Sequence, residues 1–202
     1  SLLVSTAAIT LRPVQQRNAE LDLRRNILLA AGLLKPDEEG NIDLLFRQID
    51  VRQADLRTGQ FLGKDETAAA SAAGKSGDGA ASAEGGQRAG VQDVYLLQRD
   101  GELQRLILPV RGMGLWSMMY GLLALGPDLT TIESLSFYEH GETPGLGGEV
   151  DNPRWKALWV GKHAFDSEGK VRIEVIKGQV TPQTPDARYK VDGLSGATFT
   201  AR

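Results

Sequence analysis

One stretch of this chain is unable to build a hydrophobic core, and it separates two parts of the sequence with different patterns. Residues 64–90 are dominated by Ala, Gly and Ser and contain no aromatic residue, Val, Leu or Ile. Such a segment buries too little apolar surface to offset the conformational entropy that it would lose on ordering. We therefore expect a mobile surface loop there, inserted into one domain rather than marking a domain boundary.

The part before this loop has the pattern of amphipathic helices. Pro13 suits the first turn of a helix, because its fixed φ and missing N–H cost nothing there. Residues 14–34 carry apolar and charged side chains at helical spacing, and Gly32 and Pro36 end the pattern. A second, shorter helix is predicted at residues 42–49. The apolar faces of both helices suit either the domain's own core or a partner subunit.

The part after the loop has the pattern of strands. Asp100 and Gly101 separate two apolar runs, and Asp-Gly in that position is a signal for a β-hairpin. Asn152 and Pro153 suit the cap and the first turn of a helix that runs to about residue 160. Strands are expected at residues 94–97, 106–110, 134–138 and 171–175. Together these elements predict an α+β fold with a mainly antiparallel sheet flanked by helices.

Composition limits the classes of function. A chain of 202 residues with 41% hydrophobic content is able to form one compact domain, with or without an appendage. The net charge of −3, with both signs intermixed, gives no basic surface for nucleic acid. The absence of cysteine excludes disulfides, thiol catalysis and iron–sulfur ligation by this chain. With only two histidines, a histidine-rich metal site is not expected either.

The most informative motif lies at residues 192–198, which read Asp-Gly-Leu-Ser-Gly-Ala-Thr. Gly193 and Gly196 permit a tight turn whose backbone N–H groups are able to cradle a phosphate, and Ser195 adds a hydroxyl donor. Thr198 needs an external activator to react, because no His or Cys lies near it in the sequence. Taken alone, this string is also typical of a small-residue surface turn.

Two further segments precede this motif. Residues 111–117 read Arg-Gly-Met-Gly-Leu-Trp-Ser, and residues 137–149 contain His-Gly-Glu-Thr-Pro-Gly-Leu-Gly. In this order, the three segments resemble the FMN-binding domains of the sodium-translocating NADH:quinone oxidoreductase and its ion-pumping relatives. Leu-Arg-Pro-Val-Gln near the start, Asp-Asn-Pro-Arg-Trp-Lys and Tyr-Lys-Val-Asp-Gly also fit the NqrC family, which forms one of the subunits of that enzyme. The resemblance covers most of the chain outside residues 64–90.

The resemblance implies a covalent flavoprotein. In that family the last Thr of the motif carries FMN through a phosphoester bond that a separate flavin transferase makes, so Thr198 is the expected attachment site. The resemblance further implies an electron-carrier subunit of a membrane complex that oxidises NADH, reduces ubiquinone and moves Na⁺ across the membrane. The sites for NADH and Na⁺ are expected on other subunits of the complex.

The resemblance also implies a location. Family members carry a single transmembrane helix before a soluble domain that faces the periplasm, which places the expected protein at the bacterial inner membrane. Residues 11–202 would then be the soluble FMN-binding domain, and residues 1–10 the end of a truncated N-terminal membrane anchor. An ordinary buried strand is the alternative for residues 1–10.

Three residues around two glycine-rich bends are candidates for contact with the flavin ring. Trp116 is expected to lie against the isoalloxazine, although a Trp without this context is more often part of a core. Glu142 and Thr143 precede a Pro-Gly bend, where their backbone or side-chain groups would hydrogen-bond the ring or the ribityl chain. The alternative for Thr143 is the cap of a helix that begins near Pro144.

The remaining candidates are apolar, cationic or part of the attachment motif. Leu146 would supply apolar contact to the ring, and Lys177 would place a cation near the flavin or its phosphate unless it is an ordinary solvated strand end. His140 is expected to be structural, because electron transfer between flavins needs no nearby protein base. The motif itself contributes Ser195, Gly196, Ala197 and Thr198.

Alternatives remain open from the sequence alone. The equivalent subunit of the ion-translocating ferredoxin:NAD⁺ oxidoreductase, or a nitrous-oxide-pathway regulator with the same domain, would have similar motifs. A flavin-free extracytoplasmic scaffold would use the same bends only to hold an assembly together. Replacing Thr198 by a residue without a hydroxyl separates this last possibility, because a scaffold would be unaffected.

Overall fold

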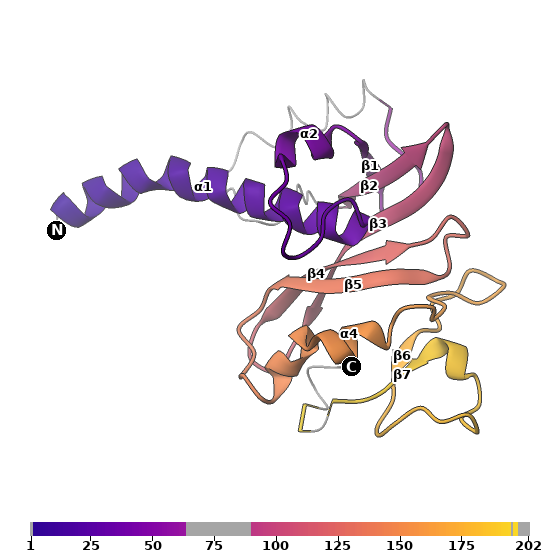
Figure 1. Ribbon diagram of the computed structural model, residues 1–202. Coiled ribbons are helices and arrows are strands. Elements are labelled where there is room, and N and C mark those ends of the chain that lie inside the picture. Colours follow the sequence, from indigo (N-terminus) through magenta and orange to yellow (C-terminus); the bar gives the residue numbers. More distant parts are fainter. Residues whose placement is uncertain (1, 64–89, 195, 198–202) are drawn as a thin grey trace. The chain divides into compact units, whose positions relative to one another are not determined.

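The computed structural model describes residues 2–63, 90–194 and 196–197 (Figure 1). Nearly all of the loop predicted at residues 64–90 lies outside these ranges, as do Ser195 and Thr198. Five strands form one sheet in the order β1-β2-β3-β4-β5, and a two-stranded sheet pairs β6 with β7. Together with the helices they confirm the predicted α+β class. The chain divides into two compact units, residues 1–95 and 96–202, with the division inside β2.

The first unit begins with the long helix α1, Leu2–Ala31 (Figure 1). The helix ends at Gly32, which has a φ of 71°. The N–H of Leu33 donates to the carbonyl of Leu28, and the N–H of Gly32 donates to the carbonyl of Leu29. This pair of bonds is the Schellman arrangement, which glycine favours because it has no Cβ to strain a positive φ. The last turns carry the buried side chains Ile27, Leu28, Ala30 and Ala31.

Helix α1 begins earlier than the sequence pattern predicted. Pro13 lies inside the helix rather than in its first turn. A proline removes one backbone hydrogen bond from a helix, but the residues on both sides are still able to be helical. The buried strand considered for residues 1–10 is wrong, because residues 2–10 are part of α1. Among the helices that the structure describes, none combines the length and the apolar character that a bilayer span requires.

Helix α2, Ile42–Phe46, is shorter than the predicted helix at residues 42–49. Asn41 caps it, since the side-chain oxygen accepts a hydrogen bond of 3.0 Å from the N–H of Leu44. Ile49 instead begins strand β1, Ile49–Asp55, which the sequence analysis did not predict. Ile49 follows two apolar residues of α2 at helical spacing, so the pattern alone does not show where the helix stops.

The strands that lead to the site form antiparallel hairpins. Strand β2, Val91–Arg99, turns into β3, Glu102–Met113. The two residues between them have positive φ, 54° at Asp100 and 82° at Gly101, which is the geometry of a type I′ turn and confirms the predicted hairpin.

Strand β4, Met118–Leu125, pairs with β3 so that Met113 faces Met118 next to the turn. Strand β5, Ile132–Glu139, pairs with β4 and includes the predicted strand at residues 134–138.

The chain after β5 contains short elements. They are η1, Gly147–Asp151; α4, Pro153–Ala157; β6, Glu174–Val175; η2, Ala187–Tyr189; and β7, Lys190–Val191. The side chain of Asn152 accepts a bond of 3.0 Å from the N–H of Arg154, which confirms the predicted cap, although α4 stops before residue 160.

The predicted strand at residues 171–175 is reduced to its last two residues. The N–H groups of Arg172 and Ile173 both donate to the carbonyl of Ala164, so the backbone there does not enter a regular ladder. The remaining residues form β6, which pairs in parallel with β7 through Glu174 with Lys190 and Val175 with Val191.

A hydrophobic cluster connects these short elements to the sheet. It takes one buried residue from each of β4, β5, η1, α4 and β7, namely Met119, Leu135, Val150, Trp155 and Val191. In Figure 1, α4, β6 and β7 lie below the β4–β5 hairpin. Val191 is 1% exposed and stands directly before the motif at residues 192–198. The motif therefore begins at the edge of a packed core.

Candidate functional site

The first residues of the C-terminal motif are held from two sides. A side-chain oxygen of Asp192 accepts a bond of 2.8 Å from the N–H of Val180. The carbonyl of Asp192 accepts a bond of 2.8 Å from the indole N–H of Trp155, which lies in the core cluster. Asp192 thus joins the motif to the preceding loop with its carboxylate and to the core with its backbone.

Gly193 continues this attachment at a place where only glycine fits. Its N–H donates to the carbonyl of Gly178 over 2.9 Å. A Cβ at position 193 would run into the carbonyl oxygen of Ile176, which is part of the backbone and has no rotamer to move away. The close approach of two backbones therefore explains this glycine of the motif.

The end of the described chain reaches another predicted residue, Leu146. Gly196 has a φ of 78°, and a Cβ there would lie 3.1 Å from a methyl carbon of Leu146. Ala197 is buried, and its N–H donates to the carbonyl of Leu194 over 3.2 Å. The structure therefore brings Leu146 and Gly196 together. Ser195 and Thr198 lie outside the described residues.

Lys177 lies on the backbone segment that runs beside the start of the motif. The N–H of Ile176 donates to the carbonyl of Val191, and the carbonyl of Gly178 accepts from Gly193. Lys177 stands between these two bonded residues and is exposed. Its position is therefore fixed relative to the motif even though its side chain lies at the surface.

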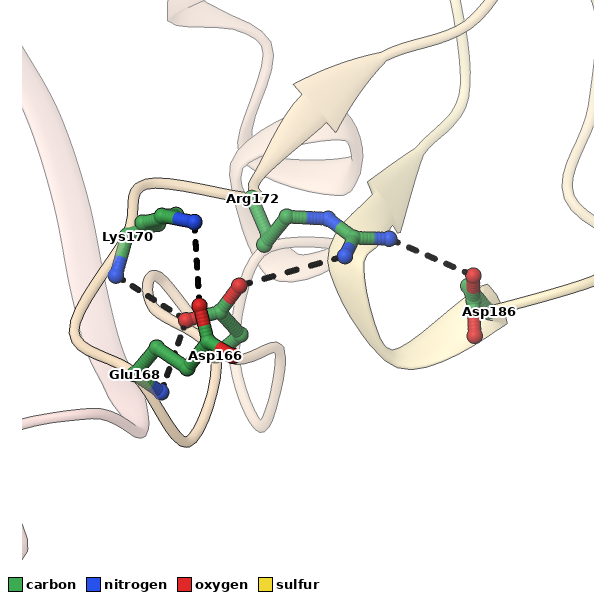
Figure 2. Close-up of polar contacts among 5 residues, drawn as sticks. All are labelled: Asp166, Glu168, Lys170, Arg172 and Asp186. Carbon is green, nitrogen blue, oxygen red and sulfur yellow. Dashed lines mark hydrogen bonds and ion pairs between the residues drawn. The ribbon is translucent and has the colours of Figure 1, made fainter.

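A polar cluster around Arg172 fixes the starts of β6 and β7 (Figure 2). One guanidinium nitrogen of Arg172 lies 3.9 Å from a carboxylate oxygen of Asp166, and another lies 3.3 Å from Asp186. The other oxygen of Asp166 accepts from the N–H groups of Glu168 and Lys170. The guanidinium also lies 5.3 Å from the ring centre of Tyr189. Arg172 therefore connects the loop before β6 with the residues just before β7.

Trp116 lies in the tight turn between β3 and β4, and a distant carboxylate organises that turn. One oxygen of Glu142 accepts from the N–H of Trp116 at 2.9 Å and of Ser117 at 3.1 Å, and the other accepts from Leu115 at 3.2 Å. Glu142 is 5% exposed, whereas Trp116 is 70% exposed and Leu115 is 51% exposed. A buried side chain thus holds a turn whose apolar side chains lie at the surface.

Two more contacts close the same turn. The N–H of Gly114 donates to the carbonyl of Ser117 over 2.8 Å, and a Cβ at Gly114 would collide with the carboxylate of Glu142. The hydroxyl oxygen of Ser117 accepts from the N–H of Gly141 over 2.7 Å. Side chains from each segment therefore bind the backbone of the other, so the segments at 114–117 and 141–142 are fixed to each other.

His140 supports the residue that carries this carboxylate. Its Nδ1 lies 3.3 Å from the N–H of Glu142, and its Nε2 lies 2.7 Å from Asp151. Because a backbone N–H only donates, Nδ1 is the accepting nitrogen, and Nε2 then carries the hydrogen that Asp151 accepts. Lys156 lies 3.6 Å from the other oxygen of Asp151. His140 is thus engaged on both ring nitrogens.

Thr143 forms the bend that follows. Its carbonyl accepts from the N–H groups of Leu146 and Gly148, at 3.1 and 2.9 Å. No helix begins at Pro144, since η1 starts at Gly147. The interpretation of Thr143 as a helix cap near Pro144 is therefore wrong, because the residue organises the bend through its backbone carbonyl.

The described residues include groups that suit a flavin nucleotide. No group of three or more metal-binding side chains occurs among them. The backbone packs closely at the glycines 114, 193 and 196, where a Cβ would meet Glu142, Ile176 and Leu146. Exposed apolar side chains at Trp116 and Leu146 suit an aromatic ring, and Lys177 suits an anionic group.

Three residues that hold the candidate site in place were not predicted from the sequence. Asp192 was noted only as the first residue of the motif, and no role was predicted for Trp155 or Arg172. Each of them acts over a long distance in sequence, from 12 to 37 residues. No local sequence signal identifies these partners, because the residues that they join lie so far apart in the chain.

Comparison with known proteins agrees with these features. Residues 114–202 match the family model described as FMN-binding domain. The chain is 47% identical over its whole length to the NqrC protein of the Na⁺-translocating NADH-quinone reductase of Pseudomonas aeruginosa, covering 82% of that protein. It is 41% identical to the equivalent protein of Yersinia pestis, again over its whole length and covering 79% of the relative.

Solved structures agree with the sequence comparisons. The crystal structure of NqrC from Shewanella oneidensis superposes with a TM-score of 0.69 at 30% identity, covering 93% of this chain and 87% of that one. The equivalent structure from Parabacteroides distasonis, at 24% identity and a TM-score of 0.65, shares the fold over 95% of this chain and 87% of that one. The resemblance found in the sequence is thereby confirmed. The chain belongs to the NqrC family of the Na⁺-translocating NADH-quinone reductases.

Proposed function

We propose that this chain carries FMN as a phosphoester on Thr198 and relays electrons within the reductase complex. The proposal is supported by the way in which the backbone that leads to Thr198 is held. Asp192 and Gly193 are bonded to Val180, Trp155 and Gly178, and Ala197 is buried. An acceptor residue needs a fixed frame and free access more than it needs its own base, because a flavin transferase supplies the activation.

The ring of the flavin is proposed to lie between the Trp116 turn and the Leu146 bend. Both present apolar side chains to solvent, and Glu142 connects the two segments by its backbone and its carboxylate. Trp116 and Leu146 would contact the ring, and Thr143 would offer hydrogen-bonding groups at its edge. Lys177, beside the start of the motif, would lie near the phosphate or the ring.

FMN would supply one-electron redox chemistry at this place, and the chain would supply position and electrostatics. A covalent link keeps the cofactor attached to a protein that must expose it to partners. We propose that NADH oxidation, ubiquinone reduction and Na⁺ transport take place on the other subunits. The remaining parts of the proposal are a single N-terminal membrane helix that ends within residues 1–10, anchorage in the bacterial inner membrane and a periplasmic position for the soluble domain.

The test is covalent attachment itself. The protein is co-expressed with a flavin transferase, separated on a denaturing gel, viewed under ultraviolet light and weighed by mass spectrometry, beside a Thr198→Ala variant. We expect a fluorescent band and a mass gain equal to FMN less water, both absent from the variant. A dark band at the unmodified mass, from folded protein and a transferase active on a known acceptor, would contradict the proposal and favour a flavin-free scaffold.

A further inference from the structure

The carboxylate of Glu142 is used in an unusual way for a buried acidic side chain. Its two oxygens accept from the backbone N–H groups of three consecutive residues, Leu115, Trp116 and Ser117. A carboxylate is costly to bury unless its oxygens are hydrogen-bonded, and here they are. What this arrangement fixes is a turn whose central side chain, Trp116, is 70% exposed.

The turn has no need of such a distant partner to close. The N–H of Gly114 already donates to the carbonyl of Ser117, and Met113 pairs with Met118 at the ends of the flanking strands. Glu142 is added from 25 to 27 residues further along the chain. Because it holds three successive N–H groups, it restricts the orientation of the peptide planes on both sides of Trp116. The direction in which the Trp116 side chain leaves the backbone is then fixed as well.

Glu142 is in turn held in place by His140 and Asp151. Its own N–H donates to Nδ1 of His140, whose Nε2 is bonded to Asp151. Asp151 ends η1, the element that follows the Leu146 bend. The position of the Trp116 turn is thereby tied to the same segment that contacts Gly196 of the motif.

We propose that Glu142 is a positioning residue that holds the Trp116 indole against the bound flavin. This inference rests on the proposed function, because it takes the flavin to lie beside Trp116. It differs from the simpler expectation that Glu142 contacts the flavin with its carboxylate, since both carboxylate oxygens are already bonded to the turn. Glu142 acts on the cofactor through Trp116.

The first test uses flavin emission, which an indole stacked on the isoalloxazine quenches. Four FMN-loaded proteins are compared: the unmodified chain, Trp116→Ala, Glu142→Ala and the double variant. The quantity measured is fluorescence per attached FMN in the folded state, with attached FMN determined after denaturation. Both single variants should raise the emission, Glu142→Ala by most of the rise seen for Trp116→Ala. The double variant should emit no more than Trp116→Ala alone, since both changes remove the same contact.

A matched control separates positioning from a general loss of stability. Asp128 also accepts three hydrogen bonds in a turn, from Thr130 and Thr131, but it lies at the opposite end of β4. Asp128→Asn should leave the emission unchanged. If Glu142→Ala does not fold, Glu142→Met takes its place, because Met fills a similar volume without an accepting oxygen.

A second measurement needs no flavin. In ¹⁵N-labelled protein, the indole N–H signal of Trp116 is assigned by its loss in Trp116→Ala, and its heteronuclear NOE reports fast motion. We expect the NOE to fall in the Glu142 variant and not in Asp128→Asn. This result would support the positioning role even if no FMN were attached, so a failure of the proposed function is distinguished from a failure of this inference.

The inference is overturned by any of three results. The first is an unchanged heteronuclear NOE of the Trp116 indole in a folded Glu142 variant. The second is a flavin emission that responds to Trp116→Ala but not to Glu142→Ala or Glu142→Met. The third is additivity of the two single variants in the double variant, which would indicate that Glu142 acts on the flavin by a separate route.

Discussion

Two turns on strand β4 are each held by a carboxylate, but the two carboxylates come from different places in the sequence. The turn after β4 is closed by its own Asp128, which accepts from the N–H groups of Thr130 and Thr131 and from the Thr131 hydroxyl. The turn before β4 is closed by the bond from Gly114 to Ser117 and is held in addition by Glu142, which comes from beyond the next strand. The first carboxylate is exposed and the second is buried.

This difference separates a turn held by its own residues from a turn held by a distant segment. Asp128 serves residues two and three positions away, so its effect ends within the loop. Glu142 fixes two remote segments to each other, and one of them carries an exposed aromatic residue, Trp116. A buried long-range carboxylate is therefore the feature that distinguishes the end of β4 at the proposed flavin site from the opposite end.

The largest effect is expected for Glu142→Ala. The substitution leaves three backbone N–H groups without their acceptor, and leaving a buried polar group unpaired costs about 1–3 kcal/mol. Because the turn is partly open to water, we expect the free energy of unfolding to fall by about 2–3 kcal/mol in total. Urea denaturation followed by far-ultraviolet circular dichroism measures this change. A loss no larger than that of Asp128→Ala would remove the distinction between the two turns.

The next effect is expected for Gly114→Ala, because a Cβ there collides with the Glu142 carboxylate. We expect a loss of about 1–2 kcal/mol, as is typical when a packed position is overfilled. When the carboxylate is removed, this collision disappears and only an approach of 3.1 Å to the carbonyl oxygen of Ser117 remains. In the Glu142→Ala background, Gly114→Ala should therefore cost much less, and a double-mutant cycle by urea denaturation should show coupling. Purely additive losses would contradict the contact.

The contrast between the turns also explains which features were predictable from the sequence. Features that depend on neighbouring residues were predictable. The Asp100-Gly101 hairpin and the Asn152 cap act within a few residues, and both appear as predicted. The end of α1 at Gly32 is another example, since a glycine after a helical pattern marks the Schellman ending. The start of α1 was missed because Pro13 is compatible with both a first turn and a helix interior.

Contacts between distant residues were not predictable from the sequence in the same way. The place of Glu142 in a motif predicts a flavin contact, but nothing in the sequence indicates that its oxygens reach residues 115–117. The same holds for the bonds of Asp192 to Val180 and Trp155. Motifs identify which residues belong to a site, whereas the partners that position them depend on how the strands bring distant segments together.

A smaller effect is expected for Asp128→Ala. The three hydrogen bonds of Asp128 are exposed, and water replaces them when the side chain is removed. We expect the free energy of unfolding to fall by about 0.5–1 kcal/mol, the net value of an ordinary hydrogen bond, instead of a multiple of it. The same urea titration measures the change, and the spectrum of any attached flavin should stay the same. A flavin response would mean that this turn also belongs to the site.

The smallest effect is a dependence on acid. The hydroxyl of Thr131, and then the backbone N–H groups of Thr131 and Thr130, stabilise the ionised Asp128 and hold its pKa below the usual value of 3.8. A carboxyl group with a lowered pKa stabilises the folded state above its unfolded pKa, and this contribution is lost as the pH falls through the folded pKa. The melting temperatures of the unmodified chain and Asp128→Asn should therefore differ at pH 7 and converge as the pH is lowered below about 3.8. If the difference instead widened in acid, the charge of Asp128 would not be what closes this turn, and the neutral geometry of its hydrogen bonds would have to carry the effect.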